Sequence, residues 1–254
     1  MILRRFIVPE TGCASYLFGC MSKGELGVVD PHADLVDEYV SAADASGARI
    51  AQVFDTHVHA DHPSGARELA ARTGAHLGLP EGAPVEFEFG PLRDGEQVAL
   101  GNTRVEVIST PGHAWAHVCL LVTDTIRGQE PWLIFTGDTL FVGAVGRPDL
   151  HGEERELVQA LQRSIHNRLL TLPDWIEIHP GHVGGSACGA GISSNPSSTI
   201  GFERRHNPLL SGDGRDFVDG VLADLSPAPA EFARIYEENK RGREALKPRA
   251  IKPR

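Results

Sequence analysis

The sequence predicts an α/β fold, and three features of the 254-residue chain carry that prediction. Short apolar, β-branched runs such as IAQVFD and TRVEVIS are typical of buried strands. These runs are separated by longer segments that have the periodicity of helices. Histidine and aspartate residues follow directly after several of the apolar runs, where loops are expected. A chain of this length is sufficient for one large domain with a well-buried core.

The first third of the chain predicts short strands and two helices. Strands are expected in FIVPETGCASYLF and LGVVDP, because apolar residues there are bounded by Gly, Pro and Asp. A helix is expected near residues 34–45, and Gly47 ends it. The strand AQVFD then leads into a histidine-rich motif, and a second helix follows over residues 64–72.

Strands dominate the middle of the chain, from residue 76 to residue 122, with a turn at residues 100–102 (LGN). A longer helix is expected around residues 153–170, and Pro173 stops it.

The composition changes after His182 to Gly, Ser and Asn, as in GGSACGAGISSNPSST, which indicates a functional loop. Two helical segments are expected beyond it, in GRDFVDGVLADL and AEFARIYEENKRGREAL. We therefore expect a core over residues 1–185 and a loop with C-terminal helices over 186–240 that completes the same domain. Residues 241–254 form a basic tail, for which a solvated end of the chain and a docking segment for an acidic partner are both considered.

The composition predicts a soluble cytoplasmic protein. A formal net charge of −10 argues against a broad surface that binds nucleic acid. The four cysteines form no CxxC pair, which is typical of reduced thiols in a cytosolic enzyme. No secretory signal is recognisable, and no stretch approaches the ~18 apolar residues of a membrane span.

Histidines and aspartates gather after four apolar runs, and this pattern predicts a metal site. They are His57, His59, Asp61, His62, His113, Asp138 and His179. A lone histidine at a strand end is usually a capping or packing residue, but THVHADH places three together. Alternation along an extended segment would put His57 and His59 on one face. Packing such groups without a cation would leave desolvated polar atoms that cost several kcal/mol each, so zinc, iron or manganese is expected.

The HxHxDH motif, followed by separated His, Asp and His residues, resembles the metallo-β-lactamase superfamily from about residue 12 to residue 182. The resemblance implies an αββα sandwich, in which two mixed sheets are flanked by helices. It also implies two metal positions. The first is formed by His57, His59 and His113, and the second by Asp61, His62 and His179, with Asp138 able to bridge them.

These ligands permit two different chemistries. Two zinc ions ~3.5–4 Å apart, bridged by Asp138, would activate water and hydrolyse a thioester, as in glyoxalase II. One ferrous ion held by His57, His113 and Asp138 would leave three coordination positions open for oxygen chemistry. In that case the remaining residues would orient the ligands and hold water. They are His59, Asp61, His62 and His179.

Two segments outside the ligands favour the iron enzyme. TGDTLFVGAVGRPDL and IHPGHVGGSACGAGISSNPSSTIGFERRHNPLL are similar to persulfide dioxygenases, especially bacterial forms often fused to rhodanese domains. The resemblance implies one Fe(II) per chain, which oxidises a low-molecular-weight thiol persulfide, such as glutathione persulfide, with O2 to sulfite and free thiol. The expected partners are a separate rhodanese sulfurtransferase and further copies of the chain in a dimer or tetramer. A non-catalytic, metal-binding regulator is the alternative from a different class.

Substrate contacts are expected from basic and hydroxyl side chains. Arg147 matches an arginine that the family places near the iron, and its planar fork suits carboxylates. The other candidates are Arg204, Arg205, Ser197 and Ser198. For the two later arginines, structural salt bridging is the alternative. Cys188, in the Gly-rich loop, is expected near the site, where it either carries sulfur or fills a tight turn.

Overall fold

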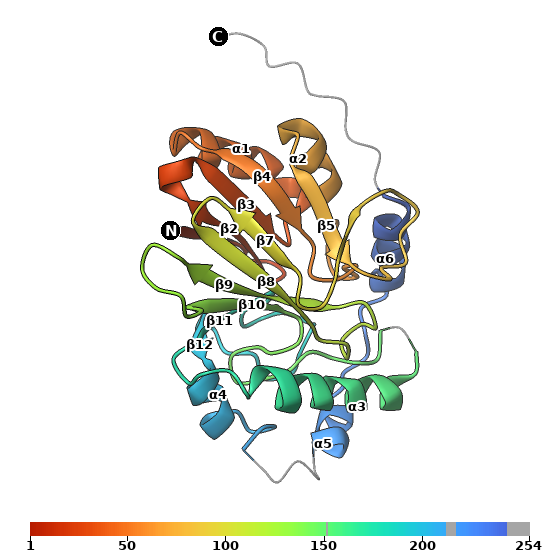
Figure 1. Cartoon of the computed structure of the whole chain (residues 1–254). Helices are drawn as coiled ribbons and strands as arrows, with labels where there is room; N and C mark the ends of the chain where they lie inside the picture. The colour runs from red at the N-terminus through yellow and green to blue at the C-terminus, as the bar shows by residue number, and fades with distance from the viewer. Residues whose placement is uncertain (151, 212–216, 243–254) are drawn as a thin grey trace.

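Two six-stranded mixed sheets lie face to face in the computed structural model, which describes residues 1–150, 152–211 and 217–242. Helices cover the outer face of each sheet, and Figure 1 shows the resulting layers from top to bottom. This arrangement confirms the predicted αββα sandwich.

The first sheet has neighbouring strands in sequence order. They are β1 (Ile2–Val8), β2 (Cys13–Cys20), β3 (Glu25–Val29), β4 (Arg49–Phe54), β5 (His76–Pro80) and β6 (Gly90–Leu92). The first three strands are antiparallel, and β3 to β6 are parallel.

The second sheet also follows the order of the chain. Its strands are β7 (Gln97–Leu100), β8 (Thr103–Ser109), β9 (Val118–Asp124), β10 (Leu133–Gly137), β11 (Glu177–Pro180) and β12 (Ser198–Thr199). Only β10 and β11 are parallel to each other. The predicted turn joins β7 to β8, where Gly101 has a φ of +58° that suits a two-residue hairpin.

The helices lie between and after these strands. They are α1 (Val36–Ala45), α2 (Ala66–Thr73), α3 (Glu154–Ser164), α4 (Ile200–His206), α5 (Phe217–Ala223) and α6 (Phe232–Arg241). A π-helical turn, Ile165–Leu169, extends α3. No helix among the described residues is long and apolar enough to cross a membrane.

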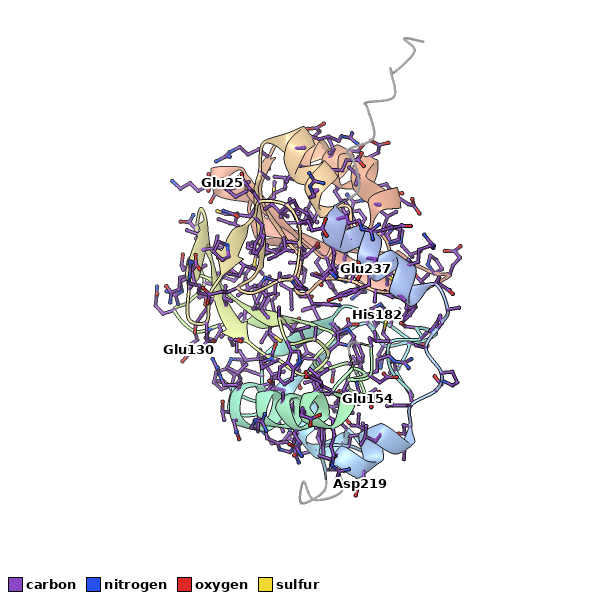
Figure 2. All side chains as sticks on the ribbon, turned by 90° about the vertical axis from the view of Figure 1, so that its right-hand side faces the viewer. Glu25, Glu130, Glu154, His182, Asp219 and Glu237 are labelled. Atoms are coloured by element: carbon purple, nitrogen blue, oxygen red, sulfur yellow. The ribbon has the colours of Figure 1, made fainter. Side chains whose placement is uncertain are left out.

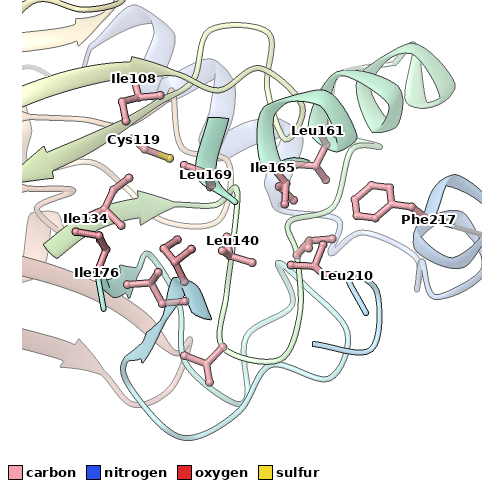
Figure 3. Packing of buried hydrophobic residues seen from close by; sticks show 14 of the residues in the cluster. Ile108, Cys119, Ile134, Leu140, Leu161, Ile165, Leu169, Ile176, Leu210 and Phe217 are labelled. Carbon is pink, nitrogen blue, oxygen red and sulfur yellow. The ribbon is translucent and has the colours of Figure 1, made fainter. Parts of the chain in front are cut away.

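Three apolar clusters hold the layers together. Between the sheets, Phe18, Phe54 and Phe135 are fully buried. A second cluster joins the first sheet to α1 and α2. A third joins the second sheet to α3, α4 and α5, with Ile165 and Phe217 among its members (Figure 3). The two sheets therefore form a rigid support for the loops at their ends.

Most expected elements form close to their predicted bounds, but α4 and β12 replace part of the expected loop after residue 182. Thr199 caps α4, since its hydroxyl oxygen accepts a hydrogen bond from the backbone N–H of Phe202 (3.1 Å). The predicted basic tail, 241–254, lies outside the described residues from residue 243 onward.

Candidate metal centre

The predicted metal-binding residues follow strands that end at one edge of the sandwich. β8 and β10 run in the same direction because both are antiparallel to β9, and β11 is parallel to β10. Their C-terminal ends therefore meet at one edge of the second sheet. β4 of the first sheet leads into residues 55–62, the histidine-rich loop, at the same edge. Figure 2 places His182 between the two layers, below the part of α6 marked by Glu237.

His57, His113 and Asp138 come together in this space. One ligand atom from each lies within 4.8 Å of the others. The ring centroids of His57 and His113 are 4.7 Å apart, and His113 Nε2 is 3.6 Å from Asp138 Oδ2. All three side chains are buried. The structure thus brings together the three residues expected to hold a single ferrous ion.

Hydrogen bonds orient both imidazoles so that a lone pair faces this space. The Nδ1–H of His113 donates to the carbonyl oxygen of Arg147 (2.8 Å), which leaves the lone pair on Nε2. The Thr56 hydroxyl donates to Asp30 Oδ2 (2.9 Å) and therefore accepts from Nδ1–H of His57 (3.0 Å). The His57 lone pair is then also on Nε2. Such partners on the opposite nitrogen are usual for histidines that bind metals.

His59 lies beside the same space, with ring centroids 4.3 Å from both His57 and His62. Its Nε2 faces carboxylate oxygens of Asp30 (3.3 Å) and Asp55 (3.6 Å). Its Nδ1 points away from these carboxylates and is available to a metal. Asp30 also binds the Thr56 amide (2.7 Å) at a positive φ of 50°, so this strained residue fixes the start of the histidine-rich loop.

Buried polar atoms without a hydrogen-bond partner show that the centre fits a cation. Among the described residues they include His57 Nε2, His59 Nδ1, His62 Nε2 and Asp138 Oδ2. Each would cost roughly 1–3 kcal/mol if left unsatisfied. Imidazole nitrogens and carboxylate oxygens are ligands for divalent transition metals, so a bound ion would satisfy these atoms together.

A second group forms around Asp61. Its Oδ2 is 2.8 Å from His182 Nε2 and 3.0 Å from His62 Nδ1. His182 Nδ1 is 2.9 Å from Asp138 Oδ1, so the His182 ring connects the two carboxylates. Asp61 and His62, which were expected to share the second position, therefore lie together, and His182 lies with them.

The structure places His179, which was expected beside Asp61 and His62, apart from both of them. This residue lies within β11 beside Phe135, and its ring packs 5.6 Å from that of Tyr16. Its Nε2 is 3.4 Å from Glu177 Oε2, outside the groups described above. His179 lies within the strand and packs against Tyr16 and Phe135, whereas His182 follows the end of the strand, as the other candidate ligands do.

Burial and neighbouring charges separate the protonation of these groups. Burial lowers the pKa of His57, and the nearby imidazoles lower it further, so His57 is neutral, as a ligand must be. Burial alone would lower the pKa of His62, but the Asp61 carboxylate raises it to about 9. Burial raises the pKa of Asp61, but the charges of His62 and His182 hold it well below its usual value. Asp61 is therefore an anion.

Three supporting residues were not identified from the sequence. Asp30 and Asp55 each end an apolar run, which is the signal that located the ligands. His117 lies four residues after His113 and stacks on His57, with ring centroids 5.1 Å apart. Its Nε2 accepts a hydrogen bond from the amide of Asp138 (3.1 Å). Burial lowers the pKa of His117 to about 3, so this acceptor stays neutral.

The C-terminal helix α6 braces the histidine-rich loop. The Asn239 side chain donates to the carbonyl oxygens of His59 (2.9 Å) and His62 (2.8 Å). Its Oδ1 accepts from the amide of Ser64 (3.0 Å). These contacts join segments about 180 residues apart in sequence, and nothing in the sequence around Asn239 distinguishes it as part of the site.

Arg147, an expected substrate contact, directs its guanidinium at groups of the protein itself. The side chain is buried and binds Asp149 through two hydrogen bonds of 2.8 Å each. Its remaining donors reach the carbonyl oxygens of Ala187 (3.0 Å) and Ser226 (2.6 Å). The guanidinium therefore ties three loops together, while the backbone carbonyl of Arg147 orients His113.

The other expected substrate contacts lie in or beside β12 and α4. Arg204 and Arg205 both pair with Asp174, which matches the structural alternative for these residues. Ser198 pairs with Ile178 in the first half of β11, whereas the metal-binding loop follows the end of that strand. Ser197 immediately precedes it. The structure does not bring these four residues to the centre.

Two thiols adjoin Asp61. Cys188 was expected near the site, and one ligand atom from it lies within 4.8 Å of those of Asp61 and His182. Cys13, which no sequence motif marks, forms a similar group with Asp61 and His62. Both cysteines are buried and reduced.

Comparisons with known proteins show the family of the chain. Residues 8–182 match the sequence model of the metallo-beta-lactamase superfamily. Persulfide dioxygenase ETHE1 from Bos taurus is 26% identical over 236 residues, which are 91% of this chain and 85% of that protein. A hydroxyacylglutathione hydrolase from Polaromonas sp. is 32% identical over 171 residues, or 66% of this chain and 61% of that protein.

Solved structures extend the similarity beyond the metal-binding loops. A metallo-beta-lactamase from Staphylococcus aureus superposes with a TM-score of 0.90 and 31% identity, covering 99% of this chain and 76% of that one. ETHE1 from Myxococcus xanthus gives a TM-score of 0.83 and 27% identity, covering 94% and 98% of the two chains.

Proposed function

The chain belongs to the metallo-beta-lactamase superfamily, and from that premise we propose that it is a persulfide dioxygenase. The proposed reaction oxidises a low-molecular-weight thiol persulfide, such as glutathione persulfide. In balanced form, RSSH, O2 and H2O give RSH, sulfite and two protons. The observation that carries this proposal is the share of the chain that each relative matches. The similarity to persulfide dioxygenase ETHE1 spans 91% of the chain, whereas the hydroxyacylglutathione hydrolase matches 66%.

The metal proposed for this reaction is one iron, held by His57, His113 and Asp138. Bound Fe(II) would supply redox chemistry with O2 and open positions for the persulfide sulfur, which zinc, without an accessible redox change, does not offer. The two imidazoles contribute lone pairs that are already oriented by Thr56 and by the carbonyl of Arg147. Asp138 contributes the anionic oxygen Oδ2, which has no other hydrogen-bond partner in the described part of the chain.

The residues around the ligands position protons for the reaction. His182 lies between the carboxylates of Asp61 and Asp138, so a proton on its ring can be shared with either one. Oxidation of a persulfide to sulfite releases protons, and this buried pair of acceptors gives them a path away from the reacting sulfur. His117 holds the Asp138 backbone in place while remaining neutral.

Oxygen uptake tests the proposal directly. Protein purified without oxygen and loaded with Fe(II) is given glutathione persulfide at a measured oxygen concentration. We expect one O2 consumed per sulfite released, loss of activity with a ferrous chelator and no recovery with zinc. Iron-loaded protein that leaves the oxygen concentration unchanged would contradict the proposal.

A thioester hydrolase is the second candidate, and the Asp61 group favours it, because a second metal position is what a two-zinc mechanism needs. The same protein, loaded with zinc and kept free of oxygen, is assayed with S-lactoylglutathione. Robust hydrolysis without persulfide-dependent oxygen uptake would replace the dioxygenase with this function. Protein that binds neither iron nor zinc would instead indicate a non-catalytic role.

A further inference from the structure

A cavity of about 80 Å³ lies beside the histidine-rich loop, on the side of α2 and β5. The loop that follows β5 and the end of α6 complete its lining. The described residues that line it include His59 but none of His57, His113 and Asp138, so the cavity is separate from the space between these three ligands. A closed cavity of roughly 150 Å³ holds one benzene molecule, so about half of that volume suits a short hydrocarbon chain.

One part of the lining is apolar. Its large apolar side chains are Val58, Leu77, Leu79, Val85 and Phe87. They come from the histidine-rich loop, from β5 and from the loop after β5. This last loop is held at the end of α6, because the amide of Glu86 donates to the carbonyl oxygen of Lys240 (2.8 Å). Hydrocarbon that enters the cavity is taken out of water along this wall, which favours binding.

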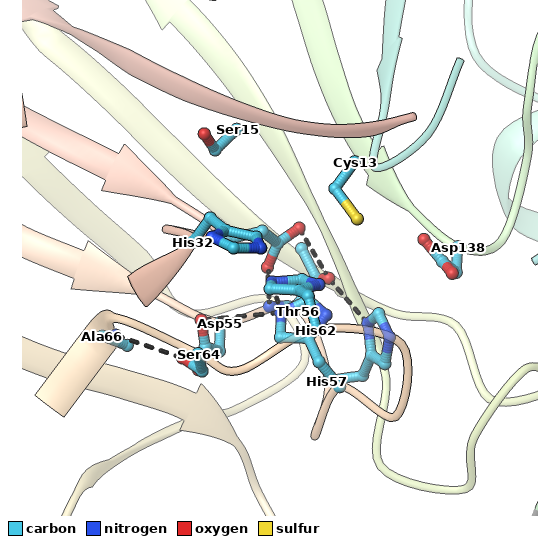
Figure 4. A network of polar contacts seen from close by, with 12 residues as sticks. Cys13, Ser15, His32, Asp55, Thr56, His57, His62, Ser64, Ala66 and Asp138 are labelled. Carbon is cyan, nitrogen blue, oxygen red and sulfur yellow. Dashed lines mark hydrogen bonds and ion pairs between the residues drawn. The ribbon is translucent and has the colours of Figure 1, made fainter. Parts of the chain in front are cut away.

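The polar part of the lining contains a buried carboxylate that has too few hydrogen-bond donors. Asp55 is only 5% exposed, and its Oδ2 accepts a hydrogen bond from the Ser64 hydroxyl (2.7 Å; Figure 4). Its Oδ1 has no hydrogen-bond partner among the described residues, and His59 Nε2, with which it forms an ion pair, is 3.6 Å away. A carboxylate accepts up to about four hydrogen bonds, and buried polar groups are usually satisfied. Asp55 can therefore accept a further donor.

The positive charge available to Asp55 is shared with a second carboxylate. His59 Nε2 faces Asp30 (3.3 Å) as well as Asp55 (3.6 Å). Asp30 also accepts hydrogen bonds from the amide (2.7 Å) and the hydroxyl (2.9 Å) of Thr56, so it is better supplied with donors than Asp55. Because one imidazole cannot neutralise two carboxylates, a net negative charge remains beside the cavity, where burial makes it costly.

The rest of the lining also favours a cation. It contains the carboxylates of Asp34 and Glu68, and Arg67 is the only Lys or Arg side chain among the described lining residues. The Arg67 guanidinium lies over the ring of Phe87, 4.8 Å from its centroid. Asp34 and Arg67 are exposed, so the cavity opens to solvent on their side. A lining of mostly negative charge raises the local concentration of cations.

We propose that this cavity binds a short primary alkylammonium ion. The ammonium group donates to the Asp55 carboxylate, and the hydrocarbon chain packs against Val58, Leu79 and Phe87. An ammonium group offers three donors on a compact charge, which suits a carboxylate with an unused acceptor. A metal ion would leave the apolar wall without a partner, and an anionic ligand would be repelled by Asp55. Neither the persulfide nor the iron takes part, so the inference goes beyond the proposed function.

Calorimetric titration with n-butylammonium chloride tests the site. The protein as purified is kept in phosphate buffer near pH 7, where butylamine is protonated, as a lysine side chain is. We expect one equivalent to bind, whereas n-butanol and butanoate, which are of similar length but lack the positive charge, should not bind. Asp55→Asn should weaken binding at least about tenfold, because it removes the charged partner of the ammonium group. Asp219→Asn, at an exposed position on α5, is the matched control and should bind as wild type.

Two sources can supply the alkylammonium group, a free amine and a lysine side chain. Lys247 and Lys252 follow Gly242, which lines the cavity, and both lie outside the described residues. A variant that combines Lys247→Gln and Lys252→Gln distinguishes the two sources. If it binds n-butylammonium more tightly than wild type, a lysine of the chain is the occupant; if it binds equally, the occupant is a free amine.

Equal binding of n-butanol or butanoate would overturn the proposal, as would an absence of n-butylammonium binding to both wild type and the double lysine variant. Val85→Trp fills the cavity without changing its charge, so it provides a second test if Asp55→Asn fails to fold. Wild-type affinity in Val85→Trp would place the bound ion elsewhere and contradict the site.

The result is independent of the proposed reaction. Absence of oxygen uptake by the iron-loaded protein would refute the dioxygenase and leave the amine titration intact. Absence of amine binding would refute the cavity site and leave the oxygen result intact.

Discussion

Replacing Asn239 tests whether α6 holds the metal-binding loop in place. Asn239→Ala removes three hydrogen bonds, two to the carbonyl oxygens of His59 and His62 and one from the amide of Ser64. At about 1 kcal/mol for each net hydrogen bond, the loss is about 3 kcal/mol. For a chain of this size each kcal/mol corresponds to about 2–4 °C, so the melting temperature should fall by about 6–12 °C.

The same change should weaken metal binding, because the carbonyls that Asn239 holds belong to two of the candidate ligands. Affinity is measured by competition with a chromophoric chelator, and stability by circular dichroism of the metal-free protein. Asn239→Asp is nearly isosteric and keeps the acceptor for Ser64, but it sets a carboxylate oxygen against two carbonyl oxygens. We expect it to be at least as destabilising as the alanine variant.

The exposed neighbouring residue supplies the control. Glu238→Ala changes the same turn of α6 without contacting the loop, so stability should stay within about 0.5 kcal/mol of wild type. A loss of 1 kcal/mol lowers the melting temperature of a chain of this size by at least about 2 °C. The bracing role would be refuted if Asn239→Ala kept its metal affinity and melted within about 2 °C of wild type, as the control should.

Three further predictions concern His179, Arg147 and Asp149. His179→Leu should retain the metal content of wild type, whereas His182→Ala should lower the metal-to-protein ratio measured by mass spectrometry; equal losses would contradict the geometry. Arg147→Lys should lower the melting temperature through loss of the paired hydrogen bonds to Asp149 and leave KM for the persulfide near that of wild type; a raised KM at unchanged stability would restore the substrate role. Burial raises the pKa of Asp149, but the Arg147 guanidinium outweighs this and holds it below its usual value. Its stabilisation is therefore present above its unfolded pKa of about 4 and lost as pH falls below that value, so Asp149→Asn should flatten the acid side of a plot of melting temperature against pH, and an unchanged slope would contradict the pairing.

Sequence patterns locate the ligands that follow strands whose ends are clearly marked. TPGH and TGD each come directly after an apolar run, so the pattern alone places His113 and Asp138 at a sheet edge. HPGH carries two histidines, and a strand end is read from sequence only to within about two residues. That uncertainty is enough to exchange a core residue, His179, for a candidate ligand, His182.

Sequence patterns do not show which partner a buried polar side chain contacts. An arginine that pairs with a nearby aspartate, as Arg147 does with Asp149, has the same sequence pattern as an arginine that binds a substrate carboxylate. Asn239 lies on an ordinary amphipathic helix, and only the folded chain shows that its amide faces the histidine-rich loop.

The position of Asn239 also has a consequence for biosynthesis. The ribosome synthesises the histidine-rich loop before α6, and Asn239, which fixes the loop, is added about 180 residues later. A nascent chain that has released His57 to His62 therefore exposes imidazoles and a carboxylate before their brace exists. The loop is therefore held in its final position only after α6 has been synthesised and has packed against it.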